Sequence, residues 1–159
     1  MKTIRLLALV LPLFFTFPSM SQTGKQAPDF SLRSDQGKTV TLSALKGNVV
    51  LVNFWATWCG PCRAEMPGFD EVYKKFHGKG LEIIGVSLDR RGWQDVTPYL
   101  KKFPVSYPIV LGYQNLVEAY GNFDAIPTSF LIDKEGKIVE RHIGYMSKTD
   151  LEKKIKPLL

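Results

Sequence analysis

The sequence predicts one α/β domain built around a central mixed sheet, and three observations support this. Two almost continuous apolar runs of strand length, residues 49–55 and 81–88, are typical of strands that are covered on both faces. Between them, residues 59–77 have the pattern of a helix that ends before Gly78 and Gly80. A strand, a helix and a strand in this order form a right-handed parallel unit.

A hairpin and a short helical turn are expected before this unit. Residues 30–32 and 40–42 alternate apolar and polar side chains, and the segment between them is rich in turn-forming residues. This pattern predicts an antiparallel β-hairpin. Residues 43–47 follow as a short helical turn that ends at Gly47.

Further helices and strands are expected after the second apolar run. Helical spacing extends over residues 93–103, where Pro98 should bend or shorten the helix. Residues 107–111 predict a short strand, and residues 116–120 predict a helical turn. The last expected elements are two antiparallel strands and a helix that Ser147 caps, at residues 129–133, 138–143 and 148–159.

The first 21 residues have the features of a secretory signal peptide. Two basic residues precede an almost wholly apolar run at residues 6–17, and Ser19 and Ser21 supply small residues for a cleavage site. The run is too short to cross a bilayer core of about 30 Å as a helix. We expect residues 1–21 to direct export and residues 22–159 to form the domain, in the periplasm or otherwise outside the cytoplasm. A first core helix and an uncleaved membrane anchor are the alternatives.

Composition and charge exclude several classes of protein. The chain has 21 Lys and Arg residues against 15 Asp and Glu residues, and a net charge of +6 does not by itself indicate nucleic-acid binding. Two cysteines are too few for a disulfide-rich scaffold or a four-cysteine zinc site. We therefore expect no metal, no cofactor and no nucleic-acid partner.

The two cysteines form a Cys-Gly-Pro-Cys motif that follows the first buried strand and begins a helix. At the helix N-cap, Cys59 would lie beside free backbone N–H groups and the positive end of the helix dipole, which stabilise a thiolate. Cys62 would lie one turn further in and be shielded. We expect the pair to form a disulfide, with Cys59 attacking a substrate and Cys62 resolving the mixed disulfide. Two structural cysteines and half a metal site are the alternatives.

Several segments resemble the exported TlpA/ResA-like thiol–disulfide oxidoreductases, which have the thioredoxin fold. The most specific segment is residues 54–67, which reads Phe-Trp-Ala-Thr-Trp-Cys-Gly-Pro-Cys-Arg-Ala-Glu-Met-Pro. The likeness continues at residues 27–30, 125–128, 130–133 and 136–139, and it covers nearly all of residues 26–159. It implies a thioredoxin-like three-layer α/β/α fold with a central mixed sheet, an N-terminal β-hairpin and an inserted helical segment.

The resemblance also implies roles for residues around the cysteines. Pro127 matches a cis proline that lies beside the cysteine pair in this fold, and the backbone of Ile126 would pair with an extended substrate. Trp58 would cover the attacking thiol and contact substrates, and Pro61 would also contact substrates. Pro67 matches a proline that kinks the active-site helix. An ordinary loop proline at 127 and a plain core or surface tryptophan at 58 are the alternatives.

Proton transfer is expected to involve a glutamate. Thioredoxin itself has a buried Asp behind its cysteines, and this sequence has Asn53 there, which cannot titrate. Glu65 lies three residues after Cys62 and therefore on the same helix face, and it matches an active-site Glu of ResA-like members. We expect Glu65 to exchange protons with Cys62 when the disulfide opens. A solvated surface glutamate is the alternative.

The expected activity is reduction of protein disulfides, because the Gly-Pro pair between the cysteines is identical to that of reducing thioredoxins. The resemblance implies a membrane thiol-electron carrier of the DsbD/CcdA type as the electron source, and cytochrome c maturation as a common role. We expect a monomer. One alternative is a copper-binding chaperone with Cys59, Cys62 and His142 as ligands. The other is a thiol peroxidase, although Cys59 lacks the Pro and Thr frame of a peroxidatic cysteine.

Overall fold

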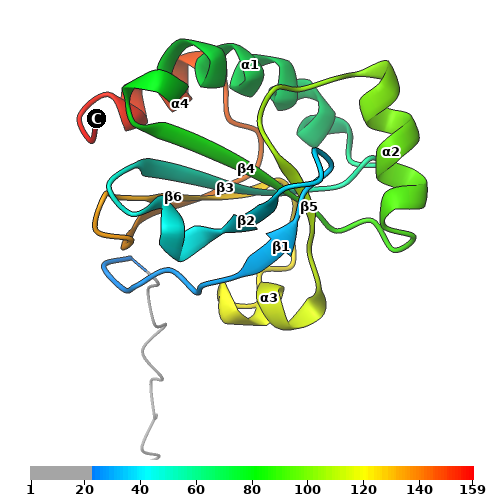
Figure 1. Cartoon of the computed structure of the whole chain (residues 1–159), viewed down its shortest axis with the longest axis horizontal. Helices are drawn as coiled ribbons and strands as arrows, with labels where there is room; N and C mark the ends of the chain where they lie inside the picture. Colours follow the sequence, from blue (N-terminus) through cyan, green and yellow to red (C-terminus); the bar gives the residue numbers. More distant parts are fainter. Residues whose placement is uncertain (1–22) are drawn as a thin grey trace, which may run out of the picture.

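The computed structural model describes residues 23–159, which contain a five-stranded mixed sheet (Figure 1). Its strands are β3 (Val49–Trp55), β4 (Leu81–Ser87), β5 (Ile109–Leu111), β6 (Thr128–Ile132) and β7 (Ile138–Ile143). They lie in the order β5-β4-β3-β6-β7. The pairs β3–β4 and β4–β5 are parallel, whereas β3–β6 and β6–β7 are antiparallel.

The central place of β3 follows from its sequence. All seven of its residues are buried, because a strand pairs with each edge and side chains cover both faces. Its alternate residues enter two separate cores: Leu51 and Trp55 pack on one face of the sheet, and Val52 and Phe54 pack on the other. The predictions of a central buried strand and of a parallel strand–helix–strand unit are both confirmed.

Helices cover both faces of the sheet, which gives the expected three layers. The helices are α1 (Gly60–Phe76), α2 (Trp93–Lys102), α3 (Gln114–Ala119) and α4 (Lys148–Ile155). In Figure 1, α1 and α4 lie on one side of the sheet and α3 lies on the other. Met66 and Leu151 place α1 and α4 in the core that contains Leu51, whereas Leu116 places α3 in the core that contains Phe54. The three-layer α/β/α fold is therefore confirmed.

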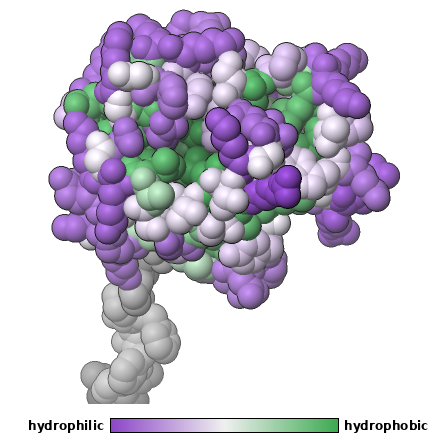
Figure 2. All heavy atoms as spheres, in the orientation of Figure 1, coloured by the Kyte–Doolittle hydropathy of each residue, from purple (hydrophilic) through white to green (hydrophobic). Residues whose placement is uncertain are grey.

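The N-terminal hairpin forms a separate two-stranded sheet. Its strands β1 (Ser31–Arg33) and β2 (Thr39–Thr41) pair antiparallel, as expected. A 3₁₀ turn at Leu42–Leu45 then leads into the central strand. Apolar side chains reach this face of the molecule in patches that are bordered by hydrophilic ones (Figure 2).

Two helices differ from expectation: α2 continues through Pro98, and α4 ends before Pro157. The helix α2 is not shortened at Pro98, because Pro98 lies on an exposed face where water can bind the Gln94 carbonyl that the proline leaves without an N–H donor. The last helix was expected to reach Leu159 but ends at Ile155. Pro157 accounts for this end, because it has no N–H to donate to the Lys153 carbonyl, although Lys156 before it still has helical backbone angles.

The expected signal peptide, residues 1–21, lies outside the described residues. Within residues 23–159, no helix has the length and apolar character that crossing a membrane requires.

Candidate active site

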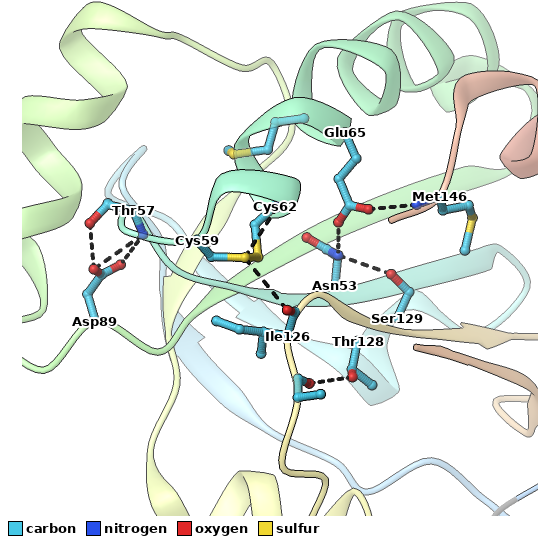
Figure 3. The surroundings of a disulfide bond; sticks show 12 residues. Asn53, Thr57, Cys59, Cys62, Glu65, Asp89, Ile126, Thr128, Ser129 and Met146 are labelled. Carbon is cyan, nitrogen blue, oxygen red and sulfur yellow. Dashed lines mark hydrogen bonds between the residues drawn. A yellow bond between two sulfur atoms is a disulfide. The ribbon is translucent and has the colours of Figure 1, made fainter. Parts of the chain in front are cut away.

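The two cysteines form a disulfide at the N-terminus of α1, directly after the loop that leaves β3 (Figure 3). Cys59 is the N-cap, with an extended backbone, and its Sγ accepts a hydrogen bond of 3.3 Å from the Cys62 backbone N–H. Pro61 lies in the first turn, where a missing N–H removes no intrahelical bond. The two residues differ in access, since Cys59 is 5% exposed and Cys62 is fully buried.

The loop before β6 lies beside the disulfide. The Ile126–Pro127 peptide bond is cis, and the carbonyl oxygen of Ile126 is 3.7 Å from Cys59 Sγ. Two hydrogen bonds hold this loop, one from Thr128 Oγ1 to the Ala125 carbonyl at 2.7 Å and one from the Gly144 N–H to the Pro127 carbonyl at 2.8 Å. The structure therefore brings together the two segments that the sequence singled out.

Glu65 is buried beneath the start of α1, with only 2% of its surface exposed. Asn53 Nδ2 donates to Glu65 Oε1 at 2.8 Å, and the Met146 N–H donates to Oε2 at 3.0 Å (Figure 3). Burial raises the pKa of Glu65 to about 7, although these two hydrogen bonds act to lower it. The alternative of a solvated surface glutamate is therefore wrong, because the carboxyl group faces β3 and the loop before α4.

Asn53 connects Glu65 to the sheet. Its Nδ2 also donates to Ser129 Oγ at 3.0 Å, so one amide group bridges α1 and β6. Its Oδ1 is buried and accepts no hydrogen bond from the part of the chain that the structure describes. Asn53 therefore fixes the position of Glu65 without adding a second titratable group.

A buried aspartate that sequence reasoning missed holds the loop before the cysteines. Asp89 accepts hydrogen bonds from the Thr57 N–H at 3.0 Å, from Thr57 Oγ1 at 2.6 Å and from Ser87 Oγ at 2.9 Å. Thr57 follows β3 and Asp89 follows β4, and the carboxyl ends of parallel strands meet at one edge of a sheet. That topology was the signal that could have identified this contact.

The surroundings of the disulfide are open on the side of Trp58, which is 69% exposed, and Pro61 is exposed as well. His142, the third ligand of the copper alternative, lies with its Nε2 atom 3.2 Å from the Tyr145 carbonyl oxygen. Among residues 23–159, no group of three or more His, Cys, Asp or Glu residues is arranged to hold a metal ion. The site contains the Cys59–Cys62 disulfide, with the buried carboxyl group of Glu65 behind it and that of Asp89 beside the loop before it.

Comparison with known proteins agrees with this geometry. The Redoxin family model matches residues 22–157. The chain is 41% identical over 148 residues to the thiol-disulfide oxidoreductase ResA of Bacillus thuringiensis (strain Al Hakam). This alignment covers 91% of this chain and 84% of that protein.

Solved structures give the same result. A thiol:disulfide interchange protein of the thioredoxin family from Chlorobium tepidum TLS aligns with a TM-score of 0.78 and 31% identity, over 88% of this chain and 99% of that one. The pneumococcal exposed lipoprotein thioredoxin Etrx1 of Streptococcus pneumoniae aligns with a TM-score of 0.74 and 34% identity, over 82% of this chain and 100% of that one. This chain therefore belongs to the Redoxin family, as a ResA-like thiol–disulfide oxidoreductase of thioredoxin fold with the Cys59–Cys62 pair.

Proposed function

We propose that the protein reduces disulfide bonds of other proteins outside the cytoplasm, through a mixed disulfide with Cys59. The observation that carries this proposal is the difference between the two sulfurs. Cys59 is the N-cap of α1 and keeps some exposure, whereas Cys62 is fully buried one turn further along the helix. A helix N-terminus stabilises a thiolate, so Cys59 is the nucleophile and Cys62 the resolving residue.

The reaction transfers two electrons from the enzyme dithiol to the client. The Cys59 thiolate attacks one sulfur of the client disulfide, which forms a mixed disulfide and releases the first client thiolate. The Cys62 thiolate then attacks Cys59 Sγ, which forms the Cys59–Cys62 disulfide and releases the second client thiolate. The two protons of the enzyme dithiol end on the two client thiols, and no further reactant is needed in this half of the cycle.

Glu65 is the proposed proton-exchange group. Both cysteines must lose a proton while the client is reduced, and Cys62 lies where solvent cannot take that proton directly. A carboxyl group with a pKa of about 7 can accept or return a proton near neutral pH. It lies one helical turn after Cys62 on the same face, where it can exchange a proton with that thiol.

The client would bind against the loop that contains the cis peptide. An extended client segment would pair with the backbone of Ile126 beside Pro127, which lies next to Cys59 Sγ. The exposed Trp58 and Pro61 border the disulfide and would contact the client from the helix side. This arrangement fits a protein substrate better than a small, enclosed ligand.

Direction and location are part of the same proposal. The Gly60–Pro61 pair is that of reducing thioredoxins, which have potentials near −270 mV, against about −120 mV for a strongly oxidising member of the fold. The pneumococcal neighbour is an exposed lipoprotein, which supports a place outside the cytoplasm for this protein. There the disulfide would be returned to the dithiol by a membrane thiol-electron carrier, and the protein would act as a monomer in maturation of c-type cytochromes or other exported proteins.

Reduction of insulin, followed by turbidity, tests the proposal. We expect the wild-type dithiol protein to reduce insulin, Cys59→Ser to abolish turnover, and Cys62→Ser to accumulate a mixed disulfide with the client that nonreducing electrophoresis shows. The equilibrium potential against glutathione should lie near that of thioredoxin. A potential near −120 mV, or turnover that survives Cys59→Ser, would contradict the proposal.

A further inference from the structure

We propose that the groove between α1 and α2 binds a client segment in which an apolar side chain lies next to an acidic one, a few residues from the client cysteine. This inference rests on the proposed function, because it assigns the kind of polypeptide that the reductase selects. Three observations support it: the groove is lined by apolar side chains, two cationic side chains at its edge make no ion pair with the described residues, and its near end lies beside Cys59.

The floor and walls of the groove are apolar. The groove has a volume of about 690 Å³ and lies between the first turns of α1 and the segment that ends α2. Its apolar lining is Met66, Pro67, Tyr99, Phe103, Pro104 and Val105. Phe103 is 49% exposed although it is a large apolar residue, and it packs against Tyr99 with 5.2 Å between the ring centroids. An aromatic or aliphatic side chain of a partner would bury this surface.

The free charge at the rim is positive. Arg63 and Lys102 line the groove, and neither makes an ion pair with any residue in the described part of the chain. The two acids at the far end, Asp70 and Glu71, are already paired with lysines outside the groove lining. An acidic partner would therefore find two unpaired cations, whereas a basic partner would find no free carboxylate.

Arg63 also stands at the aromatic wall. Arg63 and Tyr99 both line the groove, and the positive charge of Arg63 acts to lower the pKa of Tyr99, which burial raises. Lys102 Nζ lies 5.3 Å from the centroid of the Phe103 ring. Apolar surface and positive charge thus lie side by side. That juxtaposition selects a client in which apolar and acidic side chains are neighbours.

The groove begins at the active site, which sets the length of the segment that it can bind. Gly60 lines its near end and directly follows Cys59, and Asp70 lines its far end. Ten residues of helix span about 15 Å. An extended chain covers that distance in about five residues, so the selected side chains lie within about five residues of the client cysteine.

Four disulfide-linked peptide dimers test the inference. Each peptide has one central Cys, and an adjacent pair of residues stands three positions before this Cys and again three positions after it. The pair is Phe-Glu, Phe-Lys, Ser-Glu or Ser-Lys. We expect kcat/KM for reduction by the wild-type protein to be about fivefold higher for Phe-Glu than for Phe-Lys, since two rim charges each have a modest effect. The Phe-Glu peptide should exceed the Ser-Glu peptide by about tenfold, because the aromatic ring buries apolar surface.

Variants of the rim and the wall separate the groove from overall charge. The double substitution Arg63→Glu and Lys102→Glu should reverse the order of the Phe-Glu and Phe-Lys peptides. The matched control, Lys25→Glu with Lys153→Glu, makes the same change in net charge at exposed lysines outside the groove and should keep the wild-type order. Phe103→Ser should reduce the advantage of Phe-Glu over Ser-Glu without changing the preference between Glu and Lys.

Binding measured without chemistry distinguishes the failure of this inference from the failure of the proposed function. Peptides with Ser in place of Cys are titrated into the ¹⁵N-labelled oxidised protein. We expect the Phe-Glu peptide to shift the amide signals of Ala64, Tyr99 and Val105, and the shifts to weaken as salt is added. If the Ser peptides shift these signals but the protein reduces none of the Cys peptide dimers, the result would support the groove and contradict the reductase proposal. Reduction with equal kcat/KM for all four peptides, shifts confined to other regions, or self-association in the groove would overturn the inference.

Discussion

Glu65 and Asp70 lie five positions apart on α1, both are buried, and their pKa values move in opposite directions. Burial raises the pKa of Glu65 to about 7, and its partners are the neutral donors Asn53 and the Met146 N–H. Burial also acts to raise the pKa of Asp70. There the Lys74 ammonium group, 2.6 Å away, and hydrogen bonding to Ser106 outweigh burial, so the pKa falls.

The comparison shows that burial alone does not determine the state of a carboxyl group. Neutral donors stabilise a carboxylate less than a cation does, so Glu65 can hold or release a proton near neutral pH while Asp70 stays ionised. The helix therefore carries a group suited to proton exchange near the cysteines and a structural ion pair further along.

The largest expected effect is the loss of pH dependence in Glu65→Gln. Folded Glu65 keeps its proton up to about pH 7, whereas the unfolded chain releases it near 4.5. The unfolded state therefore binds fewer protons between these values, and wild-type stability falls as pH rises through them, by on the order of 3 kcal/mol. Glutamine does not titrate, so the variant lacks this fall. Urea unfolding of both oxidised proteins between pH 4.5 and 8 measures the difference, and parallel curves would show that Glu65 has an ordinary pKa.

Asp70→Asn should have a smaller effect with the opposite dependence on pH. The lowered pKa means that the folded state favours the charged form, so this stabilisation is present above the unfolded pKa and is lost as pH falls through the folded pKa. We expect the variant to lose about 2 kcal/mol at pH 7, because a buried hydrogen-bonded charge is removed, and much less in acid. A double-mutant cycle with Lys74→Met isolates the ion pair, and a coupling energy of zero would exclude Lys74 as the cause.

Asn53→Asp tests the role of neutral donors. The substitution keeps the shape of the side chain but replaces the N–H group that contacts Glu65 with a second carboxyl group. The two carboxyl groups then share a proton, and the apparent pKa for release of the last proton should rise by about one unit or more above that of wild-type Glu65. Carbon-13 NMR of the carboxyl signals measures it, and an unchanged titration would mean that Asn53 does not tune this site.

The smallest effect is expected at Glu71, the residue after Asp70. Its ion pair with Lys148 has both side chains largely exposed, so solvent and salt screen it. Glu71→Gln should leave the urea midpoint unchanged at pH 7 and at pH 5. A clear loss of stability in this variant would contradict the expectation that an exposed ion pair on α1 contributes little to stability.

The local parts of the fold could be predicted from sequence. The observed bounds of β3 and β7 are the predicted ones, because a continuous apolar run and a turn-bounded segment mark them without reference to distant residues. The end of α4 could also have been predicted from Pro157, since the missing N–H group of a proline is a local property of the sequence. The continuation of α2 through Pro98 could not be predicted, because it depends on whether Pro98 lies on the exposed face of the helix, where solvent can reach the Gln94 carbonyl.

The candidate site divides in the same way. The cysteine pair and the helix face of Glu65 follow from spacing within one helix. The burial of Glu65 does not, because it depends on the Met146 N–H, 81 positions away, and on Asn53. The contact of Thr57 with Asp89 spans 32 positions and becomes visible only when the two parallel strands are placed side by side.

The hydrogen bond from Met146 to Glu65 gives the molecule a label-free internal sensor. The amide of Met146 lies in the loop between β7 and α4, where no regular ladder protects it, and the Glu65 carboxyl group is its hydrogen-bond acceptor. Its exchange with deuterated solvent should therefore accelerate when that carboxyl group takes up a proton and accepts more weakly. A single backbone position would then report the charge inside the enzyme without any probe attached to sulfur.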